Sequence, residues 1–450
     1  MKKMFTPMLA IALTAFAGMN FSAKALVGNW RGNLKVGRGE LPIVLTFGTD
    51  SLGNTTCSFT SPMQSNESMP MAVDLCTADS LVVRYPQLGI IYRASVSPER
   101  ISGRFRQFLN GFDLTLTPEV PLTARRPQTP VPPFPYVTVD TTFTSADGTV
   151  LSGTITRPAN AVADVPMVVM VSGSGPQNRD EEIFEHRPFA VIADYLARNG
   201  VASLRYDDRG TAMSQGNFAT STTYTFRDDA KSAIDFARTL PGISRTGILG
   251  HSEGGTIALM LAADGIPDFI ISLAGMAVEA KETLIAQNRH RAEQVGLDST
   301  TCAAMGRLLG LVFDEIASQY SRGIVEEIDV RALMAGNGIE MPDNLAAEIQ
   351  QSVNQRTPWF DCFLTIDPDS FLGKIKCPVL ALNGKKDTQV DATRNLAAIS
   401  SAIPQAQIHA MPELNHLFQH ADTGDISEYG NITETISPEV LDLIIDFCRK

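Results

Sequence analysis

The chain has 450 residues, of which 44% are hydrophobic, and its formal net charge is −12 at pH 7. A chain of this length and composition can bury a large core and is long enough for two or three domains. The acidic balance excludes the basic footprint typical of proteins that bind nucleic acid or an anionic membrane surface.

Residues 1–25 have the pattern of a secretory signal peptide. Lys2 and Lys3 precede an apolar stretch from Met8 to Met19, and small residues follow as far as Ala25. The apolar stretch is shorter than the ~20 residues that a membrane-spanning helix needs, so we expect cleavage rather than stable membrane insertion. The sequence therefore predicts an exported protein, periplasmic or extracellular.

Residues 26–118 contain short runs of alternating apolar and polar residues, such as "IVLTFG", "SLVVRY" and "GIIYRASV". This period of two, interrupted by turn residues, predicts a small antiparallel β domain. Cys57 and Cys76 fall in this domain, and a disulfide between them and two buried thiols are equally compatible with the sequence. Residues 119–135 are rich in proline, which disfavours regular hydrogen-bonded structure, and they predict a linker between domains.

Residues 136–450 follow a different pattern. Two strands flank an Asp147-Gly148 turn, and apolar strands then alternate with helical segments at 186–199 and about 226–239. Strands that alternate with helices predict an α/β domain with a mostly parallel sheet covered by helices on its faces.

The stretch "GILGHSEGGTIALM" (247–260) places Ser252 between a buried strand and a helix. Its spacing is G-x-S-x-G, in which small neighbours allow a sharp turn that exposes the serine hydroxyl. By itself this short pattern fits either a nucleophilic serine or an ordinary turn residue. Its position at the carboxyl end of a central strand is where ligands bind in open α/β sheets.

Several separated stretches in the same order resemble the α/β-hydrolase fold, and in particular the two-domain secreted bacterial carboxylesterases. The stretches that carry this resemblance are "VSGSGPQNRDE" (171–181), "LRYDDRGTAMSQGNF" (204–218), "GHSEGG" (250–255), "PWF" (358–360), "CPVLALNGKKDTQV" (377–390) and "NHLFQ" (415–419). The resemblance covers most of the chain, including the small β domain. It implies a serine hydrolase whose nucleophile, acid and histidine follow one another in that order along the chain.

Ser252 would need a general base to activate its hydroxyl. His416 follows the last predicted strand in a loop, as the histidine of the resembled family does, and we take it as the base with His420 as the alternative. His290 lies in a charged helical run and His409 lies within a strand, so surface exposure and packing respectively account for them.

The acid that orients this histidine is predicted to be Asp387, just past the strand "PVLALNG". Asp391 is the nearest alternative, but its place before "ATRNLAAISSAI" predicts a helix cap. Asp207, Asp208 and Arg209 could suggest a second carboxylate site, and we interpret them instead as an ion-pair and hydrogen-bond network that supports the turn beside the active site.

The oxyanion of the tetrahedral intermediate needs hydrogen-bond donors. The backbone N–H of Glu253, directly after the serine, is one candidate. The loop Gly173-Ser174-Gly175 replaces the HGGG-type loop of lipases, and we expect Ser174 rather than Gly175 to supply the second donor. The predicted chemistry uses no metal ion and no organic cofactor.

Residues of about 277–360 form an insertion with helical patterning, which resembles the cap that covers the pocket in many α/β-hydrolases. The sequence thus predicts a serine hydrolase that cleaves small-molecule carboxylic esters through an acyl-enzyme, with no nucleic-acid partner. Two alternatives stay open: a serine peptidase or aminopeptidase of the same fold, and an inactive surface-binding protein that acts through its β domain.

Overall fold

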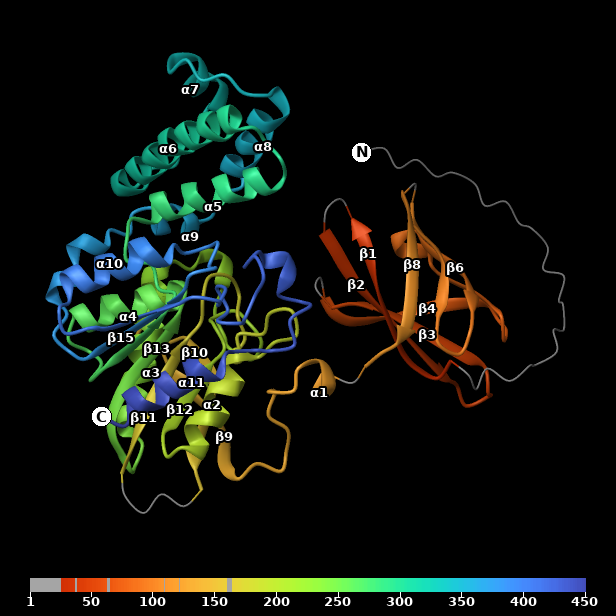
Figure 1. The fold of residues 1–450 in the computed structure, drawn as a ribbon, viewed down its shortest axis with the longest axis horizontal. Coiled ribbons are helices and arrows are strands. Elements are labelled where there is room, and N and C mark those ends of the chain that lie inside the picture. Colours follow the sequence, from red (N-terminus) through yellow and green to blue (C-terminus); the bar gives the residue numbers. More distant parts are fainter. Residues whose placement is uncertain (1–25, 37–38, 63–64, 109, 121, 160–163) are drawn as a thin grey trace. The chain divides into compact units, whose positions relative to one another are not determined.

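The computed structural model describes residues 26–36, 39–62, 65–108, 110–120, 122–159 and 164–450. The chain forms two compact units that divide between Pro121 and Leu122 (Figure 1). The division falls inside the proline-rich segment. The signal peptide predicted for residues 1–25 lies outside the described residues.

The first unit is a closed barrel of eight antiparallel strands. Its strands are β1 (Gly28–Val36), β2 (Gly39–Thr49), β3 (Thr55–Ser61), β4 (Ser65–Cys76), β5 (Ser80–Tyr85), β6 (Ile90–Val96), β7 (Ile101–Gln107) and β8 (Asn110–Pro118), with a 3₁₀ turn η2 (Pro86–Leu88). β1 pairs with β8 through Trp30 opposite Pro118, and this pairing closes the barrel. Among the described strands of this unit, closure removes the free edge at which a sheet could pair with another chain.

Side chains fill the interior of the barrel. Trp30, Leu45, Tyr92 and Leu116 are among the buried residues that form its core. Alternate residues of each strand point inward, which explains the period of two in the sequence. The Tyr92 hydroxyl lies 2.9 Å from the carbonyl oxygen of Leu114, so its polar end is satisfied inside the apolar core.

The second unit contains an eight-stranded sheet in the order β16-β15-β14-β13-β11-β12-β10-β9. The bounds are β9 (Tyr136–Thr144), β10 (Val150–Pro158), β11 (Val165–Val171), β12 (Ala202–Tyr206), β13 (Ile243–His251), β14 (Ile270–Leu273), β15 (Val379–Gly384) and β16 (Gln407–Met411). The pairs from β12 through β16 are parallel, whereas β10 is antiparallel to both β9 and β12. This is the mostly parallel sheet that the sequence predicts.

Helices cover both faces of the sheet. On one face lie α3 (Thr223–Thr239), α4 (Glu253–Ala263) and α10 (Ala392–Ala402); on the other lie α2 (Pro188–Arg198) and α11 (Pro438–Cys448). Alternate residues of β11 enter the two cores, Val169 on the first face and Val168 and Met170 on the second. Because both faces are buried, the strand reads as a continuous apolar run instead of an alternating one.

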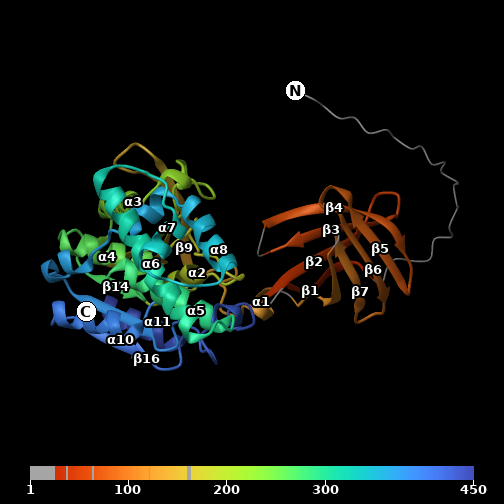
Figure 2. The same cartoon turned by 90° about the horizontal axis from the view of Figure 1, so that it is seen from above.

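A helical insertion separates β14 from β15. It comprises α5 (Ala280–Gln294), α6 (Ser299–Arg322), α7 (Val330–Gly336), α8 (Asp343–Asn354) and α9 (Pro358–Phe363). These helices have a core of their own, formed by residues such as Leu308, Val312 and Ile349. Figure 1 shows α5 to α8 stacked beyond the sheet, and the view from above shows them lying over it (Figure 2). We call this insertion the cap.

The remaining short elements are α1 (Leu122–Arg125), η3 (Phe218–Thr220), η4 (Pro368–Ser370), η5 (Leu372–Lys374) and η6 (Ile426–Glu428). Cys57 and Cys76, whose pairing the sequence left open, are both free thiols. Within the described part of the chain, every helix is too short or too polar to cross a membrane.

Candidate active site

Ser252 lies at a sharp turn between β13 and α4, and its backbone is strained. Its φ is +53° and its ψ is −118°, a conformation that residues with a side chain rarely adopt. A Cβ atom on Gly250 would lie 1.9 Å from the carbonyl oxygen of Gly254, and one on Gly254 would lie 2.0 Å from that of Val171. The two glycines are therefore required by close backbone approach, as the G-x-S-x-G spacing predicts.

Asp387 and His416, which are 29 residues apart, form a hydrogen bond. Asp387 follows β15 and His416 follows β16, and Oδ2 of the aspartate lies 2.7 Å from Nδ1 of the histidine. The other oxygen of Asp387 accepts hydrogen bonds from the backbone N–H groups of Gln389 and Val390 at 2.7 and 2.9 Å. The carboxylate is thus held in place, and Nε2 of His416 is left as the nitrogen that can accept a proton.

His251, the residue before Ser252, connects the turn to His416. The two imidazole rings have centroids 4.7 Å apart, and Nε2 of His251 bonds to the backbone carbonyl oxygen of His416 at 3.0 Å. The described residues include no hydrogen bond between the Ser252 hydroxyl and the His416 ring. Such catalytic hydrogen bonds are often long in unliganded enzymes and tighten when substrate binds.

The loop after β11 lies against the serine. A Cβ atom on Gly173 would lie 3.2 Å from the Cβ of Ser252, and the Gly173 N–H donates to Glu181 at 2.7 Å. The Ser174 hydroxyl donates to the carboxylate of Glu253 at 2.8 Å. Within the described residues, the Gly173 N–H and the Ser174 hydroxyl are therefore already engaged, whereas the backbone N–H of Ser174 has no hydrogen-bond acceptor.

Asp208 is bonded to both ends of the same loop. One of its oxygens lies 2.8 Å from the Ser172 hydroxyl, and the other accepts the Gln177 N–H at 3.0 Å. Burial, with a smaller contribution from the nearby carboxylates of Glu253 and Glu181, raises the pKa of this carboxyl to about 8 against the lowering effect of its hydrogen bonds. The raised pKa favours the protonated, neutral form of Asp208, and its two hydrogen bonds hold the loop in place.

Asp207 and Arg209 support the adjacent turn, as the sequence predicts. Arg209 forms ion pairs with Asp229 and Asp147, the latter at 2.8 Å. Asp207 accepts hydrogen bonds from the backbone and the guanidinium group of Arg179. Each of the two arginines is thus paired with carboxylates beside the loop that carries Ser174.

The alternative candidates occupy other roles. Asp391 caps α10 by accepting the Arg394 N–H at 2.8 Å, the role that the sequence predicts for it. His420 is exposed and lies 2.8 Å from Glu434. His290 and His409 are both partly exposed, and they lie on α5 and β16.

Two buried carboxylates at the site were not predicted from the sequence. Glu181 lies 2.9 Å from Nδ1 of His251. Glu253 accepts hydrogen bonds from Thr223 at 2.6 Å and from the Trp359 indole at 2.9 Å, in addition to that from Ser174. Burial raises the pKa of Glu253, against the lowering effect of these donors. His251 and Glu253 are the two variable positions of G-x-S-x-G, so the pattern marks their places but not their partners.

Comparison with known protein families shows which family the chain belongs to. The sequence profile of the X-Pro dipeptidyl-peptidase (S15) family matches residues 147–420, which is more than half of the chain. The chain belongs to the S15 family. The matched range contains Ser252, Asp387 and His416. This S15 protein therefore has the α/β-hydrolase fold, preceded by a β-barrel unit.

This S15 protein is also similar to known esterases. It is 30% identical over 149 residues to esterase EstD of Thermotoga maritima, a match that covers 33% of this chain and 36% of that esterase. Among solved structures, an esterase from Pyrococcus furiosus is 13% identical, with a TM-score of 0.41 and coverage of 70% of this chain and 92% of that one. The structure of Est1E from Butyrivibrio proteoclasticus with ferulic acid bound is 19% identical, with a TM-score of 0.41 and coverage of 68% of this chain and 96% of that one.

Proposed function

We propose that this serine hydrolase cleaves carboxylic esters through an acyl-enzyme, with Ser252 as nucleophile, His416 as base and Asp387 as the acid that orients the base. The observation that carries the proposal is the 2.7 Å bond between Asp387 and His416, next to a strained serine turn. The similarity to esterase EstD supports an ester as the substrate.

In the proposed reaction, the Ser252 oxygen attacks the ester carbonyl carbon while Nε2 of His416 takes the hydroxyl proton. The negative charge that forms on the carbonyl oxygen is stabilised by the backbone N–H groups of Glu253 and Ser174. When the tetrahedral intermediate collapses, His416 gives its proton to the departing alcohol. Water then attacks the acyl-enzyme with the same base, releasing the carboxylic acid and free Ser252.

A peptidase is the second candidate, because the family takes its name from peptidases that release dipeptides. Recognition of a free peptide N-terminus calls for a carboxylate that can pair with an ammonium group. Glu253 already accepts from three donors, and Glu181 already binds His251 and the Gly173 N–H. Neither of these two carboxylates is therefore free to pair with the ammonium group of a peptide, which supports an ester as the substrate.

The test is a panel of p-nitrophenyl acyl esters and aminoacyl-prolyl p-nitroanilides, measured with the wild type and Ser252→Ala. We expect ester hydrolysis by the wild type only, and covalent labelling of the wild type only by a fluorophosphonate probe. A preference for the anilides would replace the esterase assignment with a peptidase. Absence of both activities and of labelling would favour the inactive surface-binding protein.

A further inference from the structure

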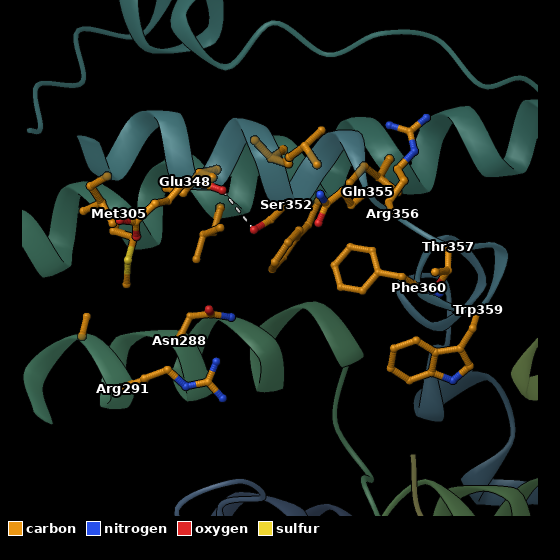
Figure 3. A pocket seen from close by; sticks show the side chains of 18 of the residues that line it. Asn288, Arg291, Met305, Glu348, Ser352, Gln355, Arg356, Thr357, Trp359 and Phe360 are labelled. Carbon is orange, nitrogen blue, oxygen red and sulfur yellow. Dashed lines mark hydrogen bonds between the residues drawn. The ribbon is translucent and has the colours of Figure 1, made fainter. Parts of the chain in front are cut away.

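A cavity of about 830 Å³ lies inside the cap, between α5 on one side and α6 and α8 on the other (Figure 3). It is within the ~300–1,000 Å³ range of pockets that bind small molecules. Its walls come from α5, α6 and α8, from Trp359 and Phe360 on α9, and from two segments below the cap.

The wall of this cavity is mainly apolar. Along α6 the lining residues are Met305, Leu309, Val312, Phe313 and Ile316, which follow the i, i+4, i+7, i+8, i+11 spacing of one helix face. These side chains are largely buried, and they contribute to the apolar surface that faces the cavity. Apolar side chains around a cavity stabilise an apolar occupant, because binding removes both surfaces from water.

The cavity extends toward the catalytic residues at one end. Gly175, which follows Ser174, lines it together with Phe218 and Ala219. Trp359 also lines it and donates its indole N–H to Glu253, the residue after Ser252. Ser252 itself is not among the lining residues. A molecule whose reacting carbonyl lies at Ser252 therefore reaches the cavity only with its far end.

We propose that the cap cavity binds the apolar chain of a medium- or long-chain ester whose carbonyl group lies at Ser252. This inference rests on the proposed esterase function and names its substrate class. The chain extends from the carbonyl past Gly175 and Trp359 to the α6 face. Short esters such as acetates react without entering the cavity.

The test compares two alanine-to-tryptophan variants of α5. Ala292 is buried and lines the cavity, so Ala292→Trp fills part of it. Ala286 is exposed on the same helix and is not a lining residue, so Ala286→Trp is the matched control. Activity is measured on p-nitrophenyl acetate, octanoate and dodecanoate, and on ethyl, octyl and dodecyl acetate.

We expect the wild type to favour the long chains in one of the two series by at least about tenfold in kcat/KM, since a single methylene in an apolar pocket is worth about tenfold or more. Ala292→Trp should lose that preference while its rate on p-nitrophenyl acetate stays within about threefold. Ala286→Trp should match the wild type. The series that shows the effect tells whether the acyl or the alcohol chain enters the cavity.

If Ala292→Trp does not fold, as judged by circular dichroism, Ser352→Trp decides the question. Ser352 lines the cavity but is exposed on α8, where its hydroxyl only donates to the Glu348 backbone carbonyl (Figure 3). Chain-length profiles that are the same in wild type, the lining variants and the control would overturn the cavity assignment alone. Failure to hydrolyse any ester, acetates included, would instead overturn the proposed function.

Discussion

Both ring nitrogens of His251 form hydrogen bonds, and one of them holds the backbone of His416. Nδ1 lies 2.9 Å from the Glu181 carboxylate and Nε2 lies 3.0 Å from the His416 carbonyl oxygen. A backbone carbonyl oxygen only accepts hydrogen bonds, and an ionised carboxylate does the same, so these two partners favour the imidazolium form of the ring. Burial opposes this charge, but Glu181 and the two hydrogen bonds outweigh it and raise the pKa of His251.

Glu181→Gln should therefore impair catalysis because it disturbs the position of His416, and not because Glu181 contacts the substrate. The substitution keeps an oxygen acceptor but removes the charge that stabilises the His251 imidazolium. We expect kcat on p-nitrophenyl acetate to fall about 10- to 100-fold, as small misplacements of catalytic groups do, with KM nearly unchanged. The His251 pKa, followed by NMR, should fall as well.

Glu182→Gln is the matched control, because Glu182 is the next residue and pairs instead with Arg187 at 3.1 Å. Its kinetics should equal those of the wild type. A Glu181→Gln variant with wild-type kcat would contradict the positioning role of the Glu181–His251 pair.

Asp387→Asn and His416→Ala should each lower kcat by about 10³- to 10⁴-fold, since removal of the acid costs about 10⁴-fold in serine proteases with the same arrangement. Asp391→Asn should stay within tenfold of the wild type, because asparagine caps a helix about as well as aspartate. His420→Ala should do the same, because its side chain is exposed. A dead His420→Ala beside an active His416→Ala would move the base to His420.

Ser174→Ala tests which atom of this residue contributes to the oxyanion site. Its hydroxyl donates to Glu253, so the proposed donor is its backbone N–H, which the substitution leaves in place. We expect kcat within about tenfold of the wild type, whereas loss of an oxyanion donor typically costs ~10²–10³-fold. A loss in that larger range, with the fold intact by circular dichroism, would identify the hydroxyl as the donor.

Asp208→Asn should change the pH dependence of stability. The pKa of Asp208 is about 8 in the folded protein, well above its ordinary value of 3.8. Between about pH 4 and pH 8 the folded state therefore holds a proton that the unfolded state releases. The contribution of Asp208 to the free energy of unfolding falls across this range as pH rises, by at most about 1.4 kcal/mol per pH unit.

Asparagine mimics the neutral carboxyl, because its oxygen can accept the Gln177 N–H while its NH₂ donates to Ser172. The variant should stay active. Its free energy of unfolding, measured in urea at several pH values, should fall less steeply with rising pH than that of the wild type. Asp264→Asn, at an exposed position, is the control. An unchanged slope in Asp208→Asn would contradict a neutral Asp208.

The catalytic unit should fold without the barrel when it begins at Leu122 but be weakened when it begins at Pro132. Arg126 is buried and donates to the backbone carbonyls of Gly430 and Ile432, and Gln128 bonds to that of Ile436 at 2.7 Å. Hydrogen bonds from a charged group contribute about 1.5–3 kcal/mol each, so the shorter form should unfold several kcal/mol more easily. Equal stability of 122–450 and 132–450 in urea would exclude this anchoring role.

Much of this architecture is visible in the sequence because it depends on neighbours along the chain. The period of two in residues 26–118 and the strand–helix alternation after residue 136 reflect burial of one or both faces of each element. The Gly250-x-Ser252-x-Gly254 turn is likewise local, since its glycines are required by contacts within a few residues and with the adjacent strand. Asp387 and Asp391 could be told apart because a helix cap has a local signature.

Tertiary structure alone decided the features that join distant segments. Closure of the barrel pairs β1 with β8, which are far apart in sequence, and alternation within each strand is the same whether a sheet is open or closed. The contact of Glu181 with His251 spans 70 residues, and that of Glu253 with Trp359 spans 106. A buried carboxylate must find donors wherever packing brings them, and a cavity is the space that packed helices leave. Neither has a local signature, because both depend on how elements formed far apart in the chain come together.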